Sequence, residues 1–194
     1  MKRIAITGSM GSGKSTVSQI LRKLGHPVYD ADLIAKKVLQ SEKTKVQLIE
    51  RYGEQILNDD LSINKTFLAS RIFNNLEDKA HLEAIIHPQV YQELLSINAD
   101  TLMFAEVPLL YESQGERFFD EVWVVVSDES ILRERLRRYR AYTDEMIDER
   151  LIHQIPQAEK MKRADVVITN NDDIEALEAS LQKALKRYEP TSTG

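Results

Sequence analysis

The sequence predicts an α/β fold, a five-stranded parallel sheet with helices on both faces. Two observations predict it. Five short apolar segments alternate along the chain with segments of helical periodicity, and the glycine-rich stretch Gly8–Ser15 joins the first apolar segment to the first helical one. A helix between two strands returns the chain to the same edge of the sheet, so successive strands run in the same direction.

Composition limits the class of protein. The chain has 194 residues, 42% of them hydrophobic, which suggests one domain or a core domain with a small insertion. No apolar run approaches the roughly 18 residues of a membrane span, and the first one ends at Gly8, too early for a signal peptide. Cysteine is absent, which excludes disulfides and thiolate metal sites, and the net charge of −5 argues against broad nucleic-acid binding. We expect a cytoplasmic protein with no membrane contact and no obligate protein partner.

The expected strands are short and mostly apolar. They are Arg3–Thr7, Pro27–Asp30, Thr101–Val107, Glu121–Ser127 and Asp165–Thr169. The fourth is a continuous apolar run, typical of a strand covered on both faces. Ligands of parallel sheets bind at the carboxyl ends of the strands, so the residues that follow these strands are the candidates for function.

The helical segments suggest how the chain is divided. We expect helices over Thr16–Leu24, over Leu33–Tyr52 with Gly53 as the stop, and over Lys65–Asn98 with an interruption near His87 and Pro88. Further helices are expected from about residue 128 through 140, over 144–153, and from about 172 through 188. Residues 65–98 are long for a simple crossover. We therefore expect a core of about 1–56, 101–127 and 164–190, a helical substrate-binding insertion of about 57–100, and a lid of about 128–163.

Gly8–Ser15 fits the phosphate-binding pattern G-x-x-x-x-G-K-[ST]. Its glycines let the backbone curl so that successive N–H groups face a polyphosphate, and the helix that follows adds its own N-terminal N–H groups. Lys14 can reach the β- and γ-phosphates, and the Ser15 hydroxyl can bind Mg²⁺. The expected nucleotide-binding residues are Gly11, Ser12, Gly13, Lys14, Ser15 and Thr16. The alternative, a chance glycine-rich turn, is disfavoured because the strand and helix that the motif requires flank it.

Asp30 and Asp32 follow the second strand. If strand geometry persists, both side chains lie on one face of the strand. A carboxylate beside the γ-phosphate could accept a proton from an attacking hydroxyl, hold Mg²⁺ through water, or cap the next helix. Capping needs only one of the two.

Five arginines gather between residues 133 and 140: Arg133, Arg135, Arg137, Arg138 and Arg140. A solvated helix face would explain them. We favour a mobile basic lid, because arginine forks stabilise the charge that phosphoryl transfer spreads over the phosphate oxygens and a lid excludes water. Arg133, Arg137 and Arg140 can line one face of the helix.

The remaining polar and aromatic candidates carry weaker signals. The four histidines show no metal-ligand spacing. His87 before Pro88 either shapes a turn or contacts substrate. Trp123, in an apolar strand, is expected in the core.

These features in order resemble one family. The matching stretches are Ile6–Thr16, Asp30–Ala35, His87-Pro88, Pro108–Glu112, Gln154 and Ala164–Asn170. Together they resemble the dephospho-CoA kinases over nearly the whole chain. The phosphate loop alone would indicate only a nucleotide-binding protein, whereas Asp-Ala-Asp followed by Pro-Leu-Leu-x-Glu is far more specific.

The resemblance implies a P-loop NTPase fold like that of nucleoside monophosphate kinases. It implies transfer of the ATP γ-phosphate, with Mg²⁺, to the ribose 3′-hydroxyl of dephospho-CoA in the last step of coenzyme A biosynthesis. Asp32 matches the catalytic base, Asn170 lies in the stretch that flanks the adenine, and Arg135 matches the arginine at the start of the lid, with Arg138 or Arg140 as a second lid arginine. The substrate-side positions are Asp30, Asp32, Lys65, His87, Pro108 and Leu109.

The chain departs from the family pattern at Lys65, where arginine is usual, and at Tyr139, where a second lid arginine is usual. Lysine keeps the charge but loses the bidentate fork. Two other functions stay open: a kinase for another small hydroxylated metabolite, and a nucleotide-gated regulatory protein without turnover. The second would need neither Asp32 nor the arginines. No Asn-Lys-x-Asp sequence occurs, which disfavours a GTPase.

Overall fold

The sheet in the computed structural model has five strands, all parallel, in the order β2-β3-β1-β4-β5. The structure describes residues 2–73, 75–97 and 102–189. The strands are β1 (Arg3–Gly8), β2 (Val28–Asp30), β3 (Met103–Glu106), β4 (Glu121–Val126) and β5 (Val166–Thr169). The predicted fold class is confirmed. The expected start of the third strand at Thr101 and the expected helix end at Asn98 lie outside the described residues.

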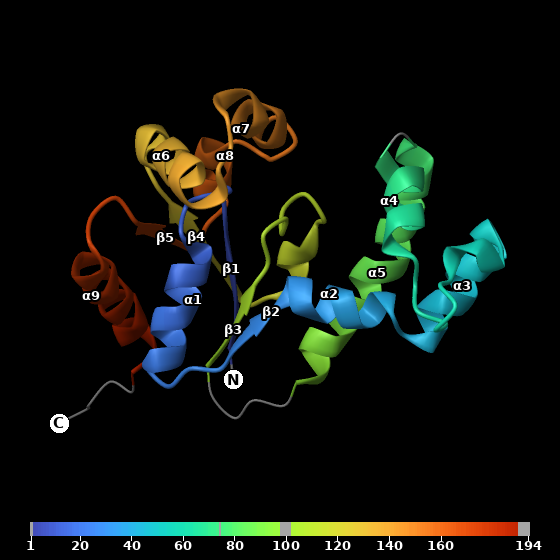
Figure 1. Ribbon diagram of the computed structural model, residues 1–194. Helices are drawn as coiled ribbons and strands as arrows, with labels where there is room; N and C mark the ends of the chain where they lie inside the picture. Colours follow the sequence, from blue (N-terminus) through green and yellow to red (C-terminus); the bar gives the residue numbers. More distant parts are fainter. Residues whose placement is uncertain (1, 74, 98–101, 190–194) are drawn as a thin grey trace. The chain divides into compact units, whose positions relative to one another are not determined.

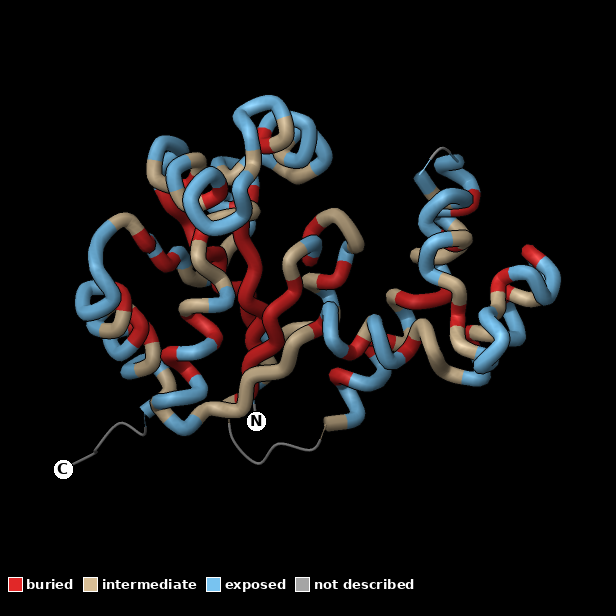
Figure 2. The backbone as a smooth tube through the Cα atoms, in the orientation of Figure 1, coloured by how far each residue is buried: buried red, intermediate tan, exposed pale blue. Residues whose placement is uncertain are grey.

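Both faces of the sheet are covered. Ile4, Ala5 and Ile6 are all 0% exposed although they point alternately to opposite faces of β1, and Figure 2 shows the central strands buried along their length. One core forms against α1 (Lys14–Lys23) and α9 (Ile174–Leu185), which lie side by side (Figure 1). Trp123 belongs to this core, as predicted.

The chain divides into two compact units. The first consists of Met1–Asp30 and Asn98–Gly194, and the second of Ala31–Ile97. The second unit thus begins at Ala31, earlier than the insertion of 57–100 expected from the sequence.

Besides α1 and α9, the described part of the first unit has the helices α6 (Glu129–Arg140), α7 (Asp144–Leu151) and α8 (Gln157–Lys162) and the short 3₁₀ helices η2 (Gly115–Phe118) and η3 (Lys186–Tyr188). The described part of the second unit has α2 (Ala31–Leu39), α3 (Glu42–Tyr52), η1 (Glu54–Ile56), α4 (Lys65–Phe73) and α5 (Leu76–Ser96). The sequence did not predict α8, which is only six residues long and follows Pro156.

The single helix expected over Leu33–Tyr52 is wrong, because α2 and α3 are separate helices. Ser41 begins the second helix as its N-cap, and its hydroxyl accepts a hydrogen bond from the Thr44 N–H. The predicted stop is confirmed: Gly53 ends α3 with a φ of 74°, a left-handed conformation that glycine adopts without steric cost.

The interruption expected near His87 and Pro88 is also wrong, because α5 continues through Pro88. Proline costs a helix one backbone hydrogen bond. Buried contacts on both sides of Pro88 offset this cost, at Ile85, Ile86, Val90, Tyr91 and Leu94. The Gln89 side chain also donates to the Ile85 carbonyl at 2.9 Å. Tertiary packing therefore outweighs the local signal.

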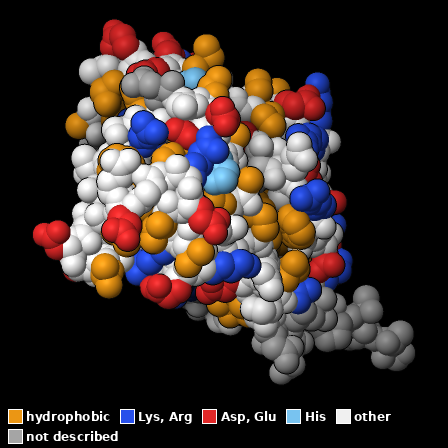
Figure 3. All heavy atoms as spheres, turned by 90° about the vertical axis from the view of Figure 1, so that its right-hand side faces the viewer, with side chains coloured by type: hydrophobic (Ala, Val, Ile, Leu, Met, Phe, Trp, Pro, Cys, Tyr) orange, Lys and Arg blue, Asp and Glu red, His pale blue; other side chains and the backbone are white. Residues whose placement is uncertain are grey.

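Charge is mixed on the face of the molecule that Figure 3 shows. Lysine and arginine side chains are interspersed there with acidic and hydrophobic ones. Among the described residues, no helix is both long enough and apolar enough to cross a membrane.

Candidate active site

The loop Gly8–Ser15 has a backbone that only glycine can supply at its key positions. Gly11 and Gly13 have φ values of 81° and 94°, in the left-handed region that disfavours other residues. A Cβ atom at Gly13 would lie 2.1 Å from Asn170 Nδ2, and one at Gly8 would lie 2.2 Å from the Val125 carbonyl oxygen. The helix α1 begins at Lys14, directly after Gly13, so the free N–H groups of its first turn lie at the end of this loop.

Lys14 and Ser15 lie at the end of this loop. Lys14 Nζ donates to the carbonyl oxygens of Gly8 and Ser9, both at 3.0 Å, so the ammonium group bends back over the loop. Ser15 is exposed, and its hydroxyl donates to Glu106 Oε1 at 3.0 Å. A cation and a hydroxyl oxygen are thus both presented where a polyphosphate would bind.

Glu106 is a residue that sequence reasoning missed. It is 8% exposed, it is the last residue of β3, and it also accepts a hydrogen bond from Ser18 Oγ at 2.8 Å. It pairs in register with Ile6 on one side and Asp30 on the other, which places it beside the loop strand. The signal in the sequence was a single carboxylate at the end of an apolar strand. Its meaning depends on β3 lying next to β1.

These oxygen donors fit Mg²⁺. The ion takes oxygen ligands and is usually held by one or two protein groups together with substrate phosphates, without an all-protein cage. Ser15 supplies a hydroxyl oxygen and Glu106 a carboxylate beside it. No group of three or more histidine, cysteine, aspartate or glutamate side chains that could hold a metal ion is found among the described residues.

Asn170 joins the loop to α6. Its side-chain Nδ2 donates to the Ser12 carbonyl at 2.8 Å, and its own carbonyl accepts from Ser127 Oγ at 2.7 Å and from Arg135 Nη1 at 3.0 Å. Asn170 is 7% exposed. Three sequence-predicted residues, Ser12, Arg135 and Asn170, are therefore brought together on the side of the loop that faces β5.

The other arginines of α6 differ from Arg135. Arg133 bonds Asp148 at 2.6 Å and Glu129 at 2.9 Å, and these hydrogen bonds raise its pKa. Arg137 bonds Asp144 at 2.9 Å. The face expected for Arg133, Arg137 and Arg140 is thus partly used to hold α6 to α7.

Arg138 and Arg140 are exposed. The Arg138 guanidinium lies 5.4 Å from the centre of the Tyr139 ring.

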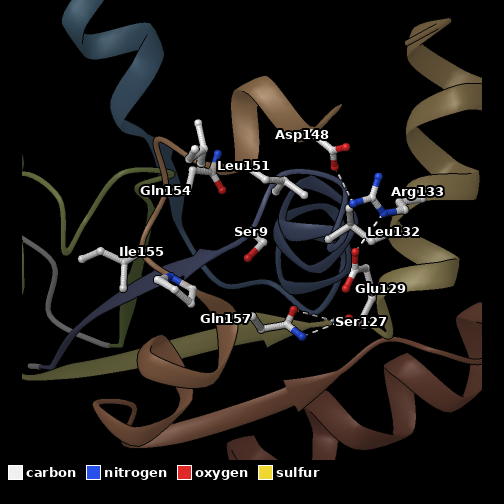
Figure 4. A pocket seen from close by; sticks show the side chains of 12 residues that line it. Ser9, Ser127, Glu129, Leu132, Arg133, Asp148, Leu151, Gln154, Ile155 and Gln157 are labelled. Atoms are coloured by element: carbon white, nitrogen blue, oxygen red, sulfur yellow. Dashed lines mark hydrogen bonds and ion pairs between the residues drawn. The ribbon is translucent and has the colours of Figure 1, made fainter. Parts of the chain in front are cut away.

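A cavity of about 510 Å³ opens beside the loop at Ser9 (Figure 4). Leu132 of α6 and Leu151 of α7 line it, together with Gln154, whose side-chain Oε1 accepts from the Met10 N–H at 3.1 Å. The expected lid segment, 128–163, therefore contacts the phosphate loop and encloses space next to it.

The Pro108–Glu112 stretch mostly makes hydrogen bonds and an ion pair with other segments of the first unit. The Pro108 carbonyl accepts from Thr7 Oγ1 at 3.3 Å, and Glu112 Oε1 accepts from the Ile155 N–H at 2.9 Å and pairs with the buried Lys160 at 2.9 Å. Leu109 is 48% exposed and so is available to a ligand.

Asp30 and Asp32 do not share a strand face, contrary to expectation. Asp30 is the last residue of β2, and α2 begins at Ala31, so Asp32 lies in the first helical turn. Asp32 is exposed and Asp30 is half-buried. A carboxylate in a first helical turn is favoured by the helix dipole.

The remaining substrate-side candidates belong to the second unit. Lys65 is the exposed first residue of α4. His87 is half-buried in α5, where burial lowers its pKa below the usual 6.5. The roles of Asp32, Lys65 and His87 stay predictions, whereas the loop, Glu106, Arg135 and Asn170 lie together within the first unit.

Comparisons with known proteins agree on one family. The sequence profile described as dephospho-CoA kinase matches residues 2–176. A dephospho-CoA kinase of Geobacillus kaustophilus is 38% identical over 193 residues, covering 96% of each chain.

Solved structures agree as well. The dephospho-CoA kinase from Campylobacter jejuni aligns with a TM-score of 0.73 at 26% identity, covering 95% of this chain and 96% of the other. A shikimate kinase from Bacteroides thetaiotaomicron, at 18% identity, covering 96% of this chain and 97% of the other with a TM-score of 0.59, shares the fold. Because the profile and the relatives span nearly the whole chain, and because the phosphate loop has the geometry that nucleotide binding requires, the chain belongs to the dephospho-CoA kinase family.

Proposed function

We propose that this chain transfers the γ-phosphate of ATP to the ribose 3′-hydroxyl of dephospho-CoA, giving coenzyme A and ADP. The observation that carries the proposal is the exposed Ser15 hydroxyl held on Glu106, beside Lys14, at the end of a loop that requires glycine. The family supplies the identity of the acceptor.

The loop and α1 bind and orient the polyphosphate. The backbone N–H groups of Gly11 and of Gly13 through Thr16 are the donors to phosphate oxygens, whereas that of Ser12 donates to the Ser9 carbonyl at 3.2 Å. Lys14 turns from the Gly8 and Ser9 carbonyls toward the β- and γ-phosphates. Holding donor and acceptor in line replaces a bimolecular encounter and is a large part of phosphoryl-transfer catalysis.

In the transfer, a bond forms between the ribose O3′ and the γ-phosphorus, and the bond from that phosphorus to the β–γ bridging oxygen breaks. The proton of the 3′-hydroxyl passes to a base, a role that the family resemblance gives to Asp32. Mg²⁺, when bound, neutralises charge on the β- and γ-phosphates, and Ser15 would hold it.

The remaining roles to assign are those of the lid arginines, of the residue near the adenine and of the residues near the acceptor. Arg135, with Arg138 or Arg140, stabilises charge on the transferring phosphate. The family resemblance puts Asn170 beside the adenine, and the hydrogen bond to the Ser12 carbonyl holds Asn170 against the loop. The family resemblance assigns contacts with the acceptor to Asp30, Asp32, Lys65, His87, Pro108 and Leu109. Cytoplasmic location and independence from a protein partner remain expectations from the sequence.

The test is ADP formation with dephospho-CoA, with its 3′-deoxy analogue and with no acceptor. The proposal predicts turnover with dephospho-CoA and none under the other two conditions. It also predicts a phosphorus signal on the 3′-oxygen of the product. Turnover of the 3′-deoxy analogue would contradict the assigned hydroxyl. ATP binding without turnover on any of these would favour a regulatory protein or a kinase for another acceptor.

A further inference from the structure

The hydroxyl that faces the nucleotide site is not the last member of its hydrogen-bond chain. Ser15 Oγ donates to Glu106 Oε1 at 3.0 Å, and Ser18 Oγ donates to Glu106 Oε2 at 2.8 Å. The two serines lie three residues apart on α1 and so project from the same side of the helix. One carboxylate therefore binds two hydroxyls, one at each oxygen.

The two serines differ in exposure. Ser15 is exposed, whereas Ser18 is 0% exposed and Glu106 is 8% exposed. Ser18 thus cannot contact a nucleotide or a metal ion. Its effect on the site must pass through Glu106.

A serine hydroxyl has one donor and two lone pairs. When the Ser15 proton points at Glu106, the lone pairs are directed elsewhere, and on an exposed residue they are available to a cation. The direction depends on where the carboxylate lies, and a ligand-orienting group of this kind commonly changes metal affinity about 10- to 100-fold. A glutamate fixed at only one oxygen could rotate about its last bond, and the second hydroxyl prevents that rotation.

We propose that Ser18 is a positioning residue for the metal-binding hydroxyl: it fixes Glu106, and Glu106 directs the lone pairs of Ser15 toward Mg²⁺. This inference rests on the proposed function, since it assumes that Ser15 binds the metal ion of a bound nucleotide. The alternative is a merely structural role, in which the Ser18 hydroxyl only satisfies the buried Glu106 carboxylate.

The experiment measures ADP binding by calorimetry at a series of fixed Mg²⁺ concentrations, including none. It compares the unaltered protein with Ser18→Ala, Ser18→Thr and Ile20→Val. Ile20 is a buried residue of the same helix, 5% exposed, so its truncation is a control for weakened packing of α1. Ser18→Cys nearly keeps the size of the side chain but offers only a weak donor to Glu106, and it provides the same test should Ser18→Ala fail to fold.

We expect Ser18→Ala and Ser18→Cys to raise the Mg²⁺ concentration needed for half of the metal effect by about tenfold, with metal-free ADP affinity unchanged. Ser18→Thr, which retains the hydroxyl, and Ile20→Val should behave like the unaltered protein. An unchanged Mg²⁺ requirement in Ser18→Ala would overturn the inference, as would an equal loss of metal-free affinity. If the unaltered protein binds no ADP at any Mg²⁺ concentration, the proposed function itself fails and the inference with it.

Discussion

Two clusters of charged side chains, one in each compact unit, have different kinds of partner. In the first unit, Lys14 bonds carbonyl oxygens of its own loop, and an exposed serine bonds Glu106, so both groups have partners that a bound phosphate or cation can replace or share. In the second unit, Arg51 pairs with Asp78 at 2.7 Å and with Glu77 at 3.1 Å, and its guanidinium lies 5.8 Å from the centre of the Tyr52 ring.

The second cluster serves the fold. Asp78 is 4% exposed and lies in the first turn of α5, whereas Arg51 lies in α3, so their ion pair joins two helices. The hydrogen bond from Arg51 lowers the pKa of Asp78. Its contribution to stability is therefore present above the ordinary pKa of an aspartate and is lost as the pH falls toward the lowered value. The comparison teaches that a charged side chain indicates function where its partners are exchangeable, and structure where they are buried and opposite in charge.

The largest expected effect concerns Lys14. Lys14→Ala should lower kcat by at least about a hundredfold, because one preorganised donor to the transferring phosphate is lost. The fold should be retained, since α1 packs into the core through buried residues such as Val17 and Leu21, and Lys14 is not one of them. Steady-state kinetics together with circular dichroism measure both. Near-normal turnover by the folded variant would refute the assignment of the loop.

The next effect separates the two aspartates. Asp32→Asn keeps the size of the side chain but loses its basicity, so kcat should fall by at least about a hundredfold with little change in MgATP affinity. Asp30→Asn, at the end of β2, is the matched variant and should affect kcat less. Kinetics and MgATP binding on both variants test this. Loss of rate in Asp30→Asn alone would reverse the assignment, and parallel loss of binding and rate in both would make the pair a metal site.

A smaller effect comes from two glycines in left-handed conformations. Gly13 and Gly25 have φ values of 94° and 88°, but only at Gly13 would a Cβ meet another atom, Asn170 Nδ2 at 2.1 Å. Gly25→Ala should cost about 1 kcal/mol of stability through backbone strain and leave ADP binding intact. Gly13→Ala should in addition weaken ADP binding by at least about tenfold, since displacing Asn170 or the loop disturbs the anion site. Equal ADP affinity in the two variants, measured by calorimetry, would show that the close approach to Asn170 has no role in binding.

The smallest expected effect is a pH dependence of the free energy of unfolding, caused by His87 in the second unit. Burial lowers the pKa of His87, and the nearby Glu83 opposes this in part. Below a pH of about 6.5 the unfolded chain binds the proton more readily than the folded one, so stability should fall as the pH decreases through that value. Urea unfolding at pH 7.5 and pH 5.5 should show a smaller loss in His87→Gln than in the unaltered protein. The control is His153→Gln, at an exposed residue of the first unit. Burial also lowers the pKa of His26, which therefore causes part of the loss of stability in every variant. A loss in His87→Gln as large as that of the unaltered protein would contradict the prediction.

The sequence predicted those features that rest on local chemistry. The phosphate loop, the five strands, the stop at Gly53 and the burial of Trp123 all follow from side chains within a few residues. The basic lid was inferred from the cluster of arginines. The choice of Asp32 as the base and of Arg135 as the first lid arginine came from the family resemblance, and all of these roles remain predictions.

Features that depend on which elements are neighbours could not be predicted. Glu106 acquires its meaning because β3 lies next to β1, which no local pattern specifies. The continuation of α5 through Pro88 depends on burial of Ile86 and Val90 on either side. The pair of Glu112 with Lys160, which is 0% exposed, joins residues far apart in the chain. In each case long-range packing decided the outcome.

The measurement that tests the comparison most directly is thermal unfolding with and without MgADP, applied to Lys14→Met and Arg51→Met. Both variants replace a cation with the same apolar side chain, one in each unit. A ligand that binds only the folded state raises the unfolding midpoint. We predict that Lys14→Met keeps the midpoint of the unaltered protein without ligand but loses most of the rise with MgADP. Arg51→Met should have a lower midpoint without ligand and the full rise with it. If Lys14→Met were the destabilised variant, or if Arg51→Met lost the rise, the division between charges that bind the nucleotide and charges that hold the fold would be contradicted.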